Sequence, residues 1–157
     1  MHSIVITRPL ALHRGLMPLV AGWFASEWPD WYGPGGQGNV IDDIEAFATS
    51  ESSLPIGMII FENDIPVGAG ALKMQSIPSH KHLSPWAAAG YVVPACRGRG
   101  LGASMLDALV SKAKTLGFEQ VYCATSTAER LLTRTGWQTL EVIVHAGKQL
   151  TIFRSAA

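Results

Sequence analysis

The chain has 157 residues, enough for a single domain over residues 1–157 whose buried core needs no disulfides or metals. Its 12 basic and 12 acidic residues cancel, which argues against binding of nucleic acid or another polyanion. The two cysteines form no disulfide framework, and the apolar stretch over residues 16–25 is too short to cross a bilayer, so we expect a cytoplasmic protein with no membrane partner.

The first third of the chain predicts one strand and two helices. Alternating hydrophobicity predicts the strand over residues 3–8. Apolar residues between 10 and 28 recur at helical spacing, and Pro18 predicts a kink or a helix start near that proline. Residues 28–38 are rich in glycine and proline and predict a loop, after which Asn39 is the expected N-cap of a second helix. The buried stripe of that helix is expected to be Ile41, Ile44, Phe47 and Ala48.

The middle of the chain predicts three strands. Residues 54–61 and 65–73 flank the turn Glu62–Asp64 and predict a hairpin. Residues 74–84 form a polar connection. The apolar run over residues 86–93 then predicts a strand in the centre of the sheet.

The last third completes an α/β pattern. A third helix ends at Gly117, and a strand follows over residues 119–124. Ser126 or Thr127 is expected to cap a short fourth helix, and residues 137–154 predict a closing hairpin. The order of elements predicts a mixed central sheet of about six or seven strands flanked by about four helices. The buried face of the third helix is expected to be Leu101, Met105, Ala108, Leu109 and Leu116.

The most informative segment is Arg97-Gly98-Arg99-Gly100-Leu101-Gly102, which joins the central strand to the third helix. The first N–H groups of a helix lack intrahelical partners, and the helix dipole adds positive charge there. Glycines let a phosphate approach the backbone, and the two arginines add formal charge. The segment therefore predicts a pyrophosphate cradle, and an ordinary glycine-rich turn with solvent-facing arginines is the alternative.

Two common phosphate motifs do not fit this spacing. A P-loop requires a lysine after its glycines, and none follows in that register. A dinucleotide fingerprint has the form Gly-x-Gly-x-x-Gly, whereas Gly98, Gly100 and Gly102 occupy every second position. Tyr122 and Cys123 stand where that fingerprint requires an acidic residue.

A third motif fits, because Arg97–Gly102 resembles the Arg/Gln-x-x-Gly-x-Gly/Ala motif of the GCN5-related N-acetyltransferases (GNAT family), which bind acetyl-coenzyme A. Residues 85–94 resemble the central strand of that family. Residues 121–125 and 131–137 resemble its next strand and the short helix that ends in Gly-Phe or Gly-Trp. The resemblance implies a GNAT-like fold and direct transfer of the acetyl group of acetyl-CoA to a primary amine on a small molecule, peptide or protein.

The resemblance also implies where acetyl-CoA, the co-substrate, is bound. The backbone near Val92 and Val93 would bond the pantetheine arm and the acetyl carbonyl, where two strands splay apart. The amides from Gly98 to Ala103 would hold the pyrophosphate, and no metal is expected. The implied cofactor-binding residues are Val92, Val93, Arg97, Gly98, Arg99, Gly100, Gly102 and Ala103.

The chain departs from the family at Leu132, which occupies the usual position of a tyrosine general acid. A free thiol has a pKa of about 8.5, so a thiolate can leave unaided. A general acid typically contributes about 10²–10⁴-fold, so its loss would slow the reaction without abolishing it. Candidates for proton transfer are Tyr91, Ser126, Thr133, Tyr122, Glu27, Asp30, His80 and His82, or water.

The acceptor site is expected at the first two helices and the loop between them. Aromatic faces interleaved with carboxylates suit a cationic amine, while burial in the core is the alternative role for Trp28. The candidate acceptor-binding residues are Glu27, Trp28, Asp30, Trp31 and Tyr32.

Two other functions compete with acetyl transfer. Leu132 and the lack of a carboxylate in residues 86–93 suit a non-catalytic acyl-CoA-binding sensor or interaction module. Contact of residues 97–99 with RNA is disfavoured by the neutral charge balance. A homodimer is compatible with the sequence, and the strands after Trp137 are the expected surface for it.

Overall fold

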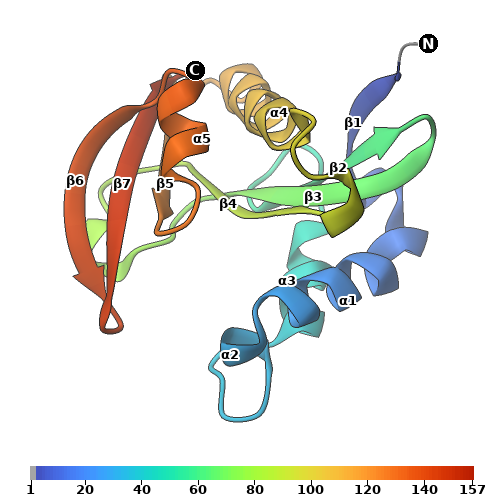
Figure 1. Cartoon of the computed structure of the whole chain (residues 1–157), viewed down its shortest axis with the longest axis horizontal. Coiled ribbons are helices and arrows are strands. Elements are labelled where there is room, and N and C mark those ends of the chain that lie inside the picture. The colour runs from blue at the N-terminus through green and yellow to red at the C-terminus, as the bar shows by residue number, and fades with distance from the viewer. Residues whose placement is uncertain (1–2) are drawn as a thin grey trace.

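Seven strands form one mixed sheet in the order β1-β2-β3-β4-β5-β7-β6 in the computed structural model, which describes residues 3–157 (Figure 1). All neighbouring strands are antiparallel except β4 and β5, which are parallel. The predicted α/β class and the expected strand number are confirmed. The strands are β1 (Val5–Pro9), β2 (Ile56–Glu62), β3 (Ile65–Lys73), β4 (Trp86–Val92), β5 (Gln120–Thr125), β6 (Gln138–His145) and β7 (Lys148–Ala156).

Helices cover both faces of the sheet, with α4 and α5 on one side and α1 to α3 on the other (Figure 1). Strand β2 explains how one sheet supports two cores, because successive side chains of a strand point to opposite faces. Met58 and Ile60 enter the core beneath α4, whereas Ile59 enters the core beneath α1 and α3. The helices are α1 (Met17–Glu27), α2 (Pro29–Tyr32), α3 (Val40–Phe47), α4 (Leu101–Thr115) and α5 (Glu129–Arg134).

The helix start expected near Pro18 is confirmed. Helix α1 begins at Met17, so Pro18 lies in its first turn, where a missing N–H is tolerated. Two short 3₁₀ turns, Leu10–Leu12 and Arg14–Leu16, occupy the preceding segment. The apolar periodicity before Pro18 therefore belongs to these turns rather than to one long helix.

Helix α3 is capped as predicted, but one residue of its expected buried stripe is exposed. The Asn39 side chain accepts a hydrogen bond from the Asp42 amide at 3.0 Å. Ile44 is buried, whereas Ile41 is 67% exposed. The first turn of α3 directs Val40, one turn before Ile44, towards the core, which leaves Ile41 facing solvent.

Two local predictions were wrong. The glycine- and proline-rich loop contains α2, because Pro29 can start a helix and the Gly33 amide closes the turn onto the Pro29 carbonyl at 2.7 Å. Helix α5 is not capped by Ser126 or Thr127. The side chain of Thr125 instead accepts from the Ala128 amide at 2.9 Å.

Candidate functional site

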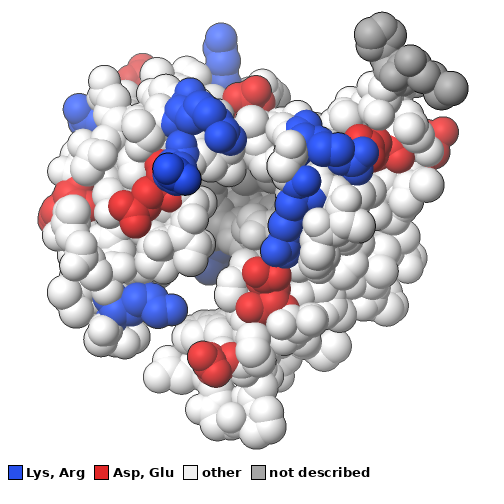
Figure 2. All heavy atoms as spheres, viewed as in Figure 1, with Lys and Arg blue, Asp and Glu red and all other residues white. Residues whose placement is uncertain are grey.

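The two halves of the sheet separate between β4 and β5. These strands pair only at Trp86 and Tyr122, where the Tyr122 amide donates to the Pro85 carbonyl at 3.0 Å. Beyond that point β4 contains an irregularity at Ala89, whose φ is 55°. The strands then diverge, and Figure 2 shows a central hollow in the molecule with charged side chains around its rim.

The glycine-rich segment lies between the end of β4 and the start of α4. Gly98 and Gly100 have φ values of 81° and 83°, a left-handed conformation that favours glycine. Gly100 is the N-cap of α4. A Cβ atom on Gly102 would lie 3.1 Å from Leu131 Cδ2, so this glycine permits close packing of α5 on α4.

The amides from Gly98 to Ala103 are the outstanding feature of this segment. Within residues 3–157, none of these six consecutive N–H groups donates to a protein acceptor. The first amide of α4 with an internal partner is Ser104, which donates to the Gly100 carbonyl at 3.1 Å. Unpartnered amides at a helix N-terminus form a ready site for an anion.

Both arginines of the segment are paired with carboxylates from distant parts of the chain. Arg97 Nη2 lies 3.0 Å from Glu27 Oε2, and Arg99 Nη2 lies 2.8 Å from Glu62 Oε1. The expected solvent-facing or phosphate-facing arginines therefore have partners on α1 and β2. Neither partner was expected from the sequence, because an ion pair between remote segments leaves no local pattern.

Arg97 also fixes the end of β4. Its Nε donates to the Val92 carbonyl at 2.7 Å, and its guanidinium carbon lies 5.5 Å from the centre of the Tyr91 ring. Trp23 of α1 also stacks on the Tyr91 ring, with ring centres 5.4 Å apart. Tyr91 thus joins α1, β4 and the glycine-rich segment.

Val92 and Val93 differ in their free backbone groups. The Val93 amide donates to the Val67 carbonyl at 2.8 Å, and the Val93 carbonyl accepts from the Cys96 amide at 2.9 Å. Successive residues of a strand direct their backbone groups to opposite sides. The Val92 N–H therefore faces away from β3, towards the hollow between β4 and β5.

The candidate acceptor residues lie at the end of α1 and in α2. Glu27 is bound to Arg97, and Asp30 is exposed. Trp31 is 48% exposed, whereas Trp28 packs edge-on against Phe24 in the core below the sheet.

Tyr32 fastens α2 to α3. Its hydroxyl donates to Asp43 Oδ2 at 2.7 Å. Burial, followed by the hydrogen bond to the Asp43 carboxylate, raises the pKa of Tyr32 well above its ordinary value. The phenol therefore stays protonated and holds the loop between the first helices against α3.

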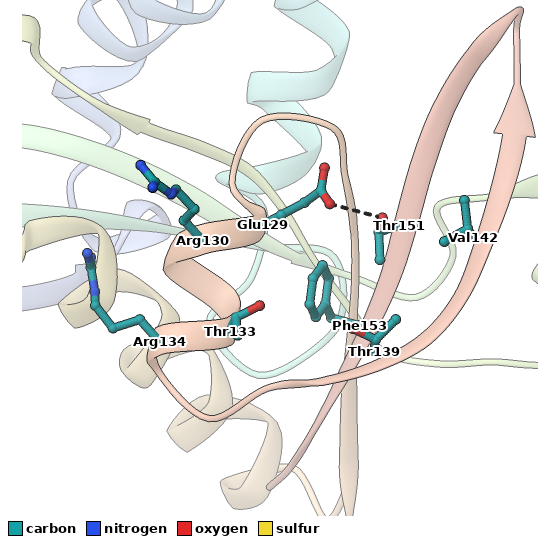
Figure 3. A pocket seen from close by; sticks show the side chains of 8 residues that line it. All are labelled: Glu129, Arg130, Thr133, Arg134, Thr139, Val142, Thr151 and Phe153. Atoms are coloured by element: carbon teal, nitrogen blue, oxygen red, sulfur yellow. Dashed lines mark hydrogen bonds between the residues drawn. The ribbon is translucent and has the colours of Figure 1, made fainter.

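The residues considered for proton transfer are dispersed. Leu132 is fully buried in the core beneath α4 and α5. Thr133 lines a separate pocket of about 650 Å³ between α5 and the β6–β7 hairpin. In this pocket the Thr151 hydroxyl donates a hydrogen bond to the Glu129 carboxylate (Figure 3). Ser126 is exposed in the turn after β5, and Tyr122 packs on Trp86. Among the residues that carry these hydroxyls, Tyr91 is the one whose ring contacts the glycine-rich segment, at Arg97.

The two histidines lie away from that segment. His80 Nε2 is 2.9 Å from Glu141 Oε1 on β6, and the His80 and His82 rings stack.

Burial raises the pKa of the Cys123 thiol to about 12, so this cysteine is protonated at neutral pH. No cluster of three or more His, Cys, Asp or Glu side chains within residues 3–157 could hold a metal ion. No helix in the same residues is both long and apolar enough to cross a membrane.

Comparison with known proteins gives one family. Residues 20–137 match the model of the family described as the acetyltransferase (GNAT) family. No match was found among curated protein sequences.

Solved structures share the fold at low sequence identity. The Salmonella typhimurium protein yncA, solved with its cofactor acetyl-CoA, is 14% identical, with a TM-score of 0.72 over 98% of this chain and 93% of that one. An aminoglycoside 6′-N-acetyltransferase complexed with coenzyme A is 13% identical, with a TM-score of 0.75 over 99% of this chain and 97% of that one. The N-acetylglutamate synthase of Neisseria gonorrhoeae, complexed with coenzyme A and N-acetyl-glutamate, is 15% identical, with a TM-score of 0.70 over 99% of this chain and 36% of that one.

Proposed function

The chain belongs to the acetyltransferase (GNAT) family, and on this premise we propose that it transfers the acetyl group of acetyl-CoA to a primary amine. We propose that residues 1–157 act as one acetyltransferase domain. The observation that carries the proposal is the run of six amides, Gly98–Ala103, that have no acceptor among residues 3–157 and lie beside the hollow between β4 and β5.

The residues present fit the cofactor. A pyrophosphate offers anionic oxygens, and six amides without protein acceptors offer donors that no other group of residues 3–157 uses. Gly98 and Gly100 have no side chain that could cover these amides. The space around them is also open, since a Cβ atom on either residue would meet no atom within 4 Å. When bound, acetyl-CoA supplies a thioester whose acyl carbon is the electrophile.

Val92 is proposed to hold the pantetheine arm and the acetyl carbonyl. Its N–H faces the hollow, whereas both backbone groups of Val93 have protein partners. A donor fixed at this position stabilises negative charge that develops on a carbonyl oxygen. Arg97 holds the Val92 carbonyl in place. Arg99, which lies within the glycine-rich segment and pairs with Glu62, is proposed to exchange that carboxylate for a phosphate of the bound cofactor.

The proposed acceptor is a cationic amine that approaches from α1 and α2. Glu27 and Asp30 supply carboxylates, and the half-exposed ring of Trp31 supplies an aromatic face. Since Arg97 already neutralises Glu27, Asp30 provides the net negative charge on this side. Trp28 and Tyr32 shape the site from below through their packing on α1 and α3.

In the chemical step a cationic amine loses one proton, attacks the acyl carbon, and loses a second proton as the amide forms and the carbon–sulfur bond breaks; this second proton replaces the one that passes to the departing sulfur. Glu27 or water at the same rim is proposed to receive the proton from the amine. Tyr91 is the proposed donor to the sulfur, since it lies next to Val92 and contacts Arg97. Ser126 and Thr133 have a weaker case, because Ser126 is exposed in the turn after β5 and Thr133 lines the pocket between α5 and the β6–β7 hairpin.

The test is release of free thiol from acetyl-CoA with a panel of amines, amino acids and short peptides. Each primary amine is paired with its N,N-dimethyl counterpart, which keeps the charge but has no second proton to lose. Acetyl transfer predicts thiol release with primary amines alone. Acetyl-CoA binding without release on any acceptor would contradict transfer and favour the acyl-CoA-binding module. Equal release with the dimethyl compounds would contradict attack by the amine.

A further inference from the structure

Strand β6 is an open edge of the sheet. The sheet order places it last, beside β7 alone. Val142 and Val144 are 54% and 76% exposed, although both are apolar and β-branched. An exposed apolar edge is a template for another strand, and proteins usually protect such edges with lysine, proline or a bulge. The irregularity of β6 lies between Thr139 and Glu141; from Glu141 to His145 the strand pairs regularly with β7 and contains neither lysine nor proline.

The backbone of β6 is presented in a defined way. A two-residue turn, Ala146-Gly147, joins β6 to β7, and both turn residues have positive φ. In such a hairpin the flanking pair, His145 and Lys148, is the hydrogen-bonded pair. The alternation along the strand then directs the backbone groups of Val142 and Val144 away from β7. These groups are available to a second strand.

We propose that β6 pairs antiparallel with β6 of a second copy of this chain, about a two-fold axis at Ile143. In this register Val142 faces Val144 of the second copy, and Glu141 faces His145 of the second copy. The backbones of the two valines would exchange about four hydrogen bonds across the axis. The valine pairs lie on one face of the extended sheet, and the Glu–His pairs lie on the other.

The charge and size pattern selects this register. A two-fold axis at Val142 would place Glu141 opposite Ile143, and an axis at Val144 would place Val142 opposite Ala146 in the turn. The axis at Ile143 matches apolar with apolar and acid with base. The Glu141 carboxylate is already held in place by His80 at 2.9 Å.

The other edge of the sheet lacks such complementarity. Strand β1 also has exposed apolar residues, including Ile4 just before it at 64% exposure. Its charged residue, Arg8, has no acidic residue on the same strand to face, and Pro9 removes a donor at the end of the strand. Pairing of β1 with β6 of another copy would be head-to-tail, which produces open chains rather than a closed dimer.

The first test is sedimentation of the full chain over a range of concentrations, without acetyl-CoA or an amine, so that it does not depend on the proposed activity. The wild type is expected to form a dimer, and Val144→Lys is expected to raise the dissociation constant at least about tenfold. Ile4→Lys, a matched substitution near the other edge, is expected to leave the dimer intact. Thermal unfolding of each variant verifies that it folds, as the exposure of both positions predicts.

The second test addresses the register. Glu141→Lys is expected to weaken the dimer, and Glu141→Lys combined with His145→Glu is expected to restore it. Both variants lose the bond to His80, so restoration reports the contact between copies. A monomeric wild type, a Val144→Lys variant that dimerises like the wild type, or assemblies that grow without limit would overturn the proposal. Failure of the double variant to recover would overturn the register.

Discussion

The clearest perturbation of the site is Gly100→Ala. Gly100 has a φ of 83° at the N-cap of α4, and an added Cβ would meet no atom within 4 Å. The cost is therefore conformational rather than steric, and a non-glycine residue in this region costs about 1–2 kcal/mol. A backbone that relieves this strain by rotating would turn the neighbouring amides away from the phosphate position.

The effect on acetyl-CoA binding follows from the same amides. A hydrogen bond to a charged group contributes about 1.5–3 kcal/mol, so loss of one lowers the affinity by about tenfold to a hundredfold. Gly100→Asn keeps much of the affinity, because asparagine tolerates the left-handed region. Gly22→Ala is the matched control, since Gly22 lies in α1 with open space around it and alanine there stabilises the helix by about 0.5–1 kcal/mol.

The assay combines calorimetric titration of acetyl-CoA with urea unfolding of the same preparations. The expected order of affinity is wild type and Gly22→Ala together, then Gly100→Asn, then Gly100→Ala. A folded Gly100→Ala protein that binds acetyl-CoA as tightly as the wild type would refute the role of this backbone. Equal losses in Gly100→Ala and Gly22→Ala would refute it as well.

Three further substitutions test the rest of the account. Leu132→Ala removes a fully buried side chain and should lower the free energy of unfolding by about 2–5 kcal/mol, whereas Thr133→Ala next to it should change it by less than about 0.5 kcal/mol in urea titrations. Tyr32→Phe removes the hydrogen bond to the Asp43 carboxylate and should cost about 1.5–3 kcal/mol at neutral pH. Since the pKa of Tyr32 is raised by folding, wild-type stability should fall as the pH rises above about 10, and Tyr32→Phe should lose part of that dependence. Glu27→Gln removes the proposed proton acceptor and leaves Arg97 without its partner, so it should lower kcat and raise KM for a cationic amine by about threefold to fivefold, the size of a partly exposed ion pair; an unchanged amine KM would remove Glu27 from the acceptor site.

Features fixed by local sequence were predictable. Asn39 caps α3 because its side chain reaches an amide three residues ahead, and that distance is visible in the sequence. The order of strand, glycine-rich segment and helix from β4 to α4 likewise follows from adjacent residues. The buried residues of α4 also follow the helical period, from Leu101 to Ala113.

Features fixed by contacts between remote segments were not predictable. The carboxylates that bind Arg97 and Arg99 come from α1 and β2, and no spacing in the chain indicates those partners. The exposure of Ile41 depends on which turn of α3 meets the sheet, which is decided by packing. The full engagement of the Val93 backbone depends on its pairing with β3 and on the turn that follows β4.

The central claim is that the amides from Gly98 to Ala103 hold the cofactor, and amide resonances of the ¹⁵N-labelled chain test it directly. Titration with acetyl-CoA should shift these resonances and that of Val92 most, in proportion to occupancy. The resonances of Val142 and Val144 at the far edge of the sheet should change little. Saturable binding that leaves residues 98–103 unshifted and perturbs another surface would contradict the account.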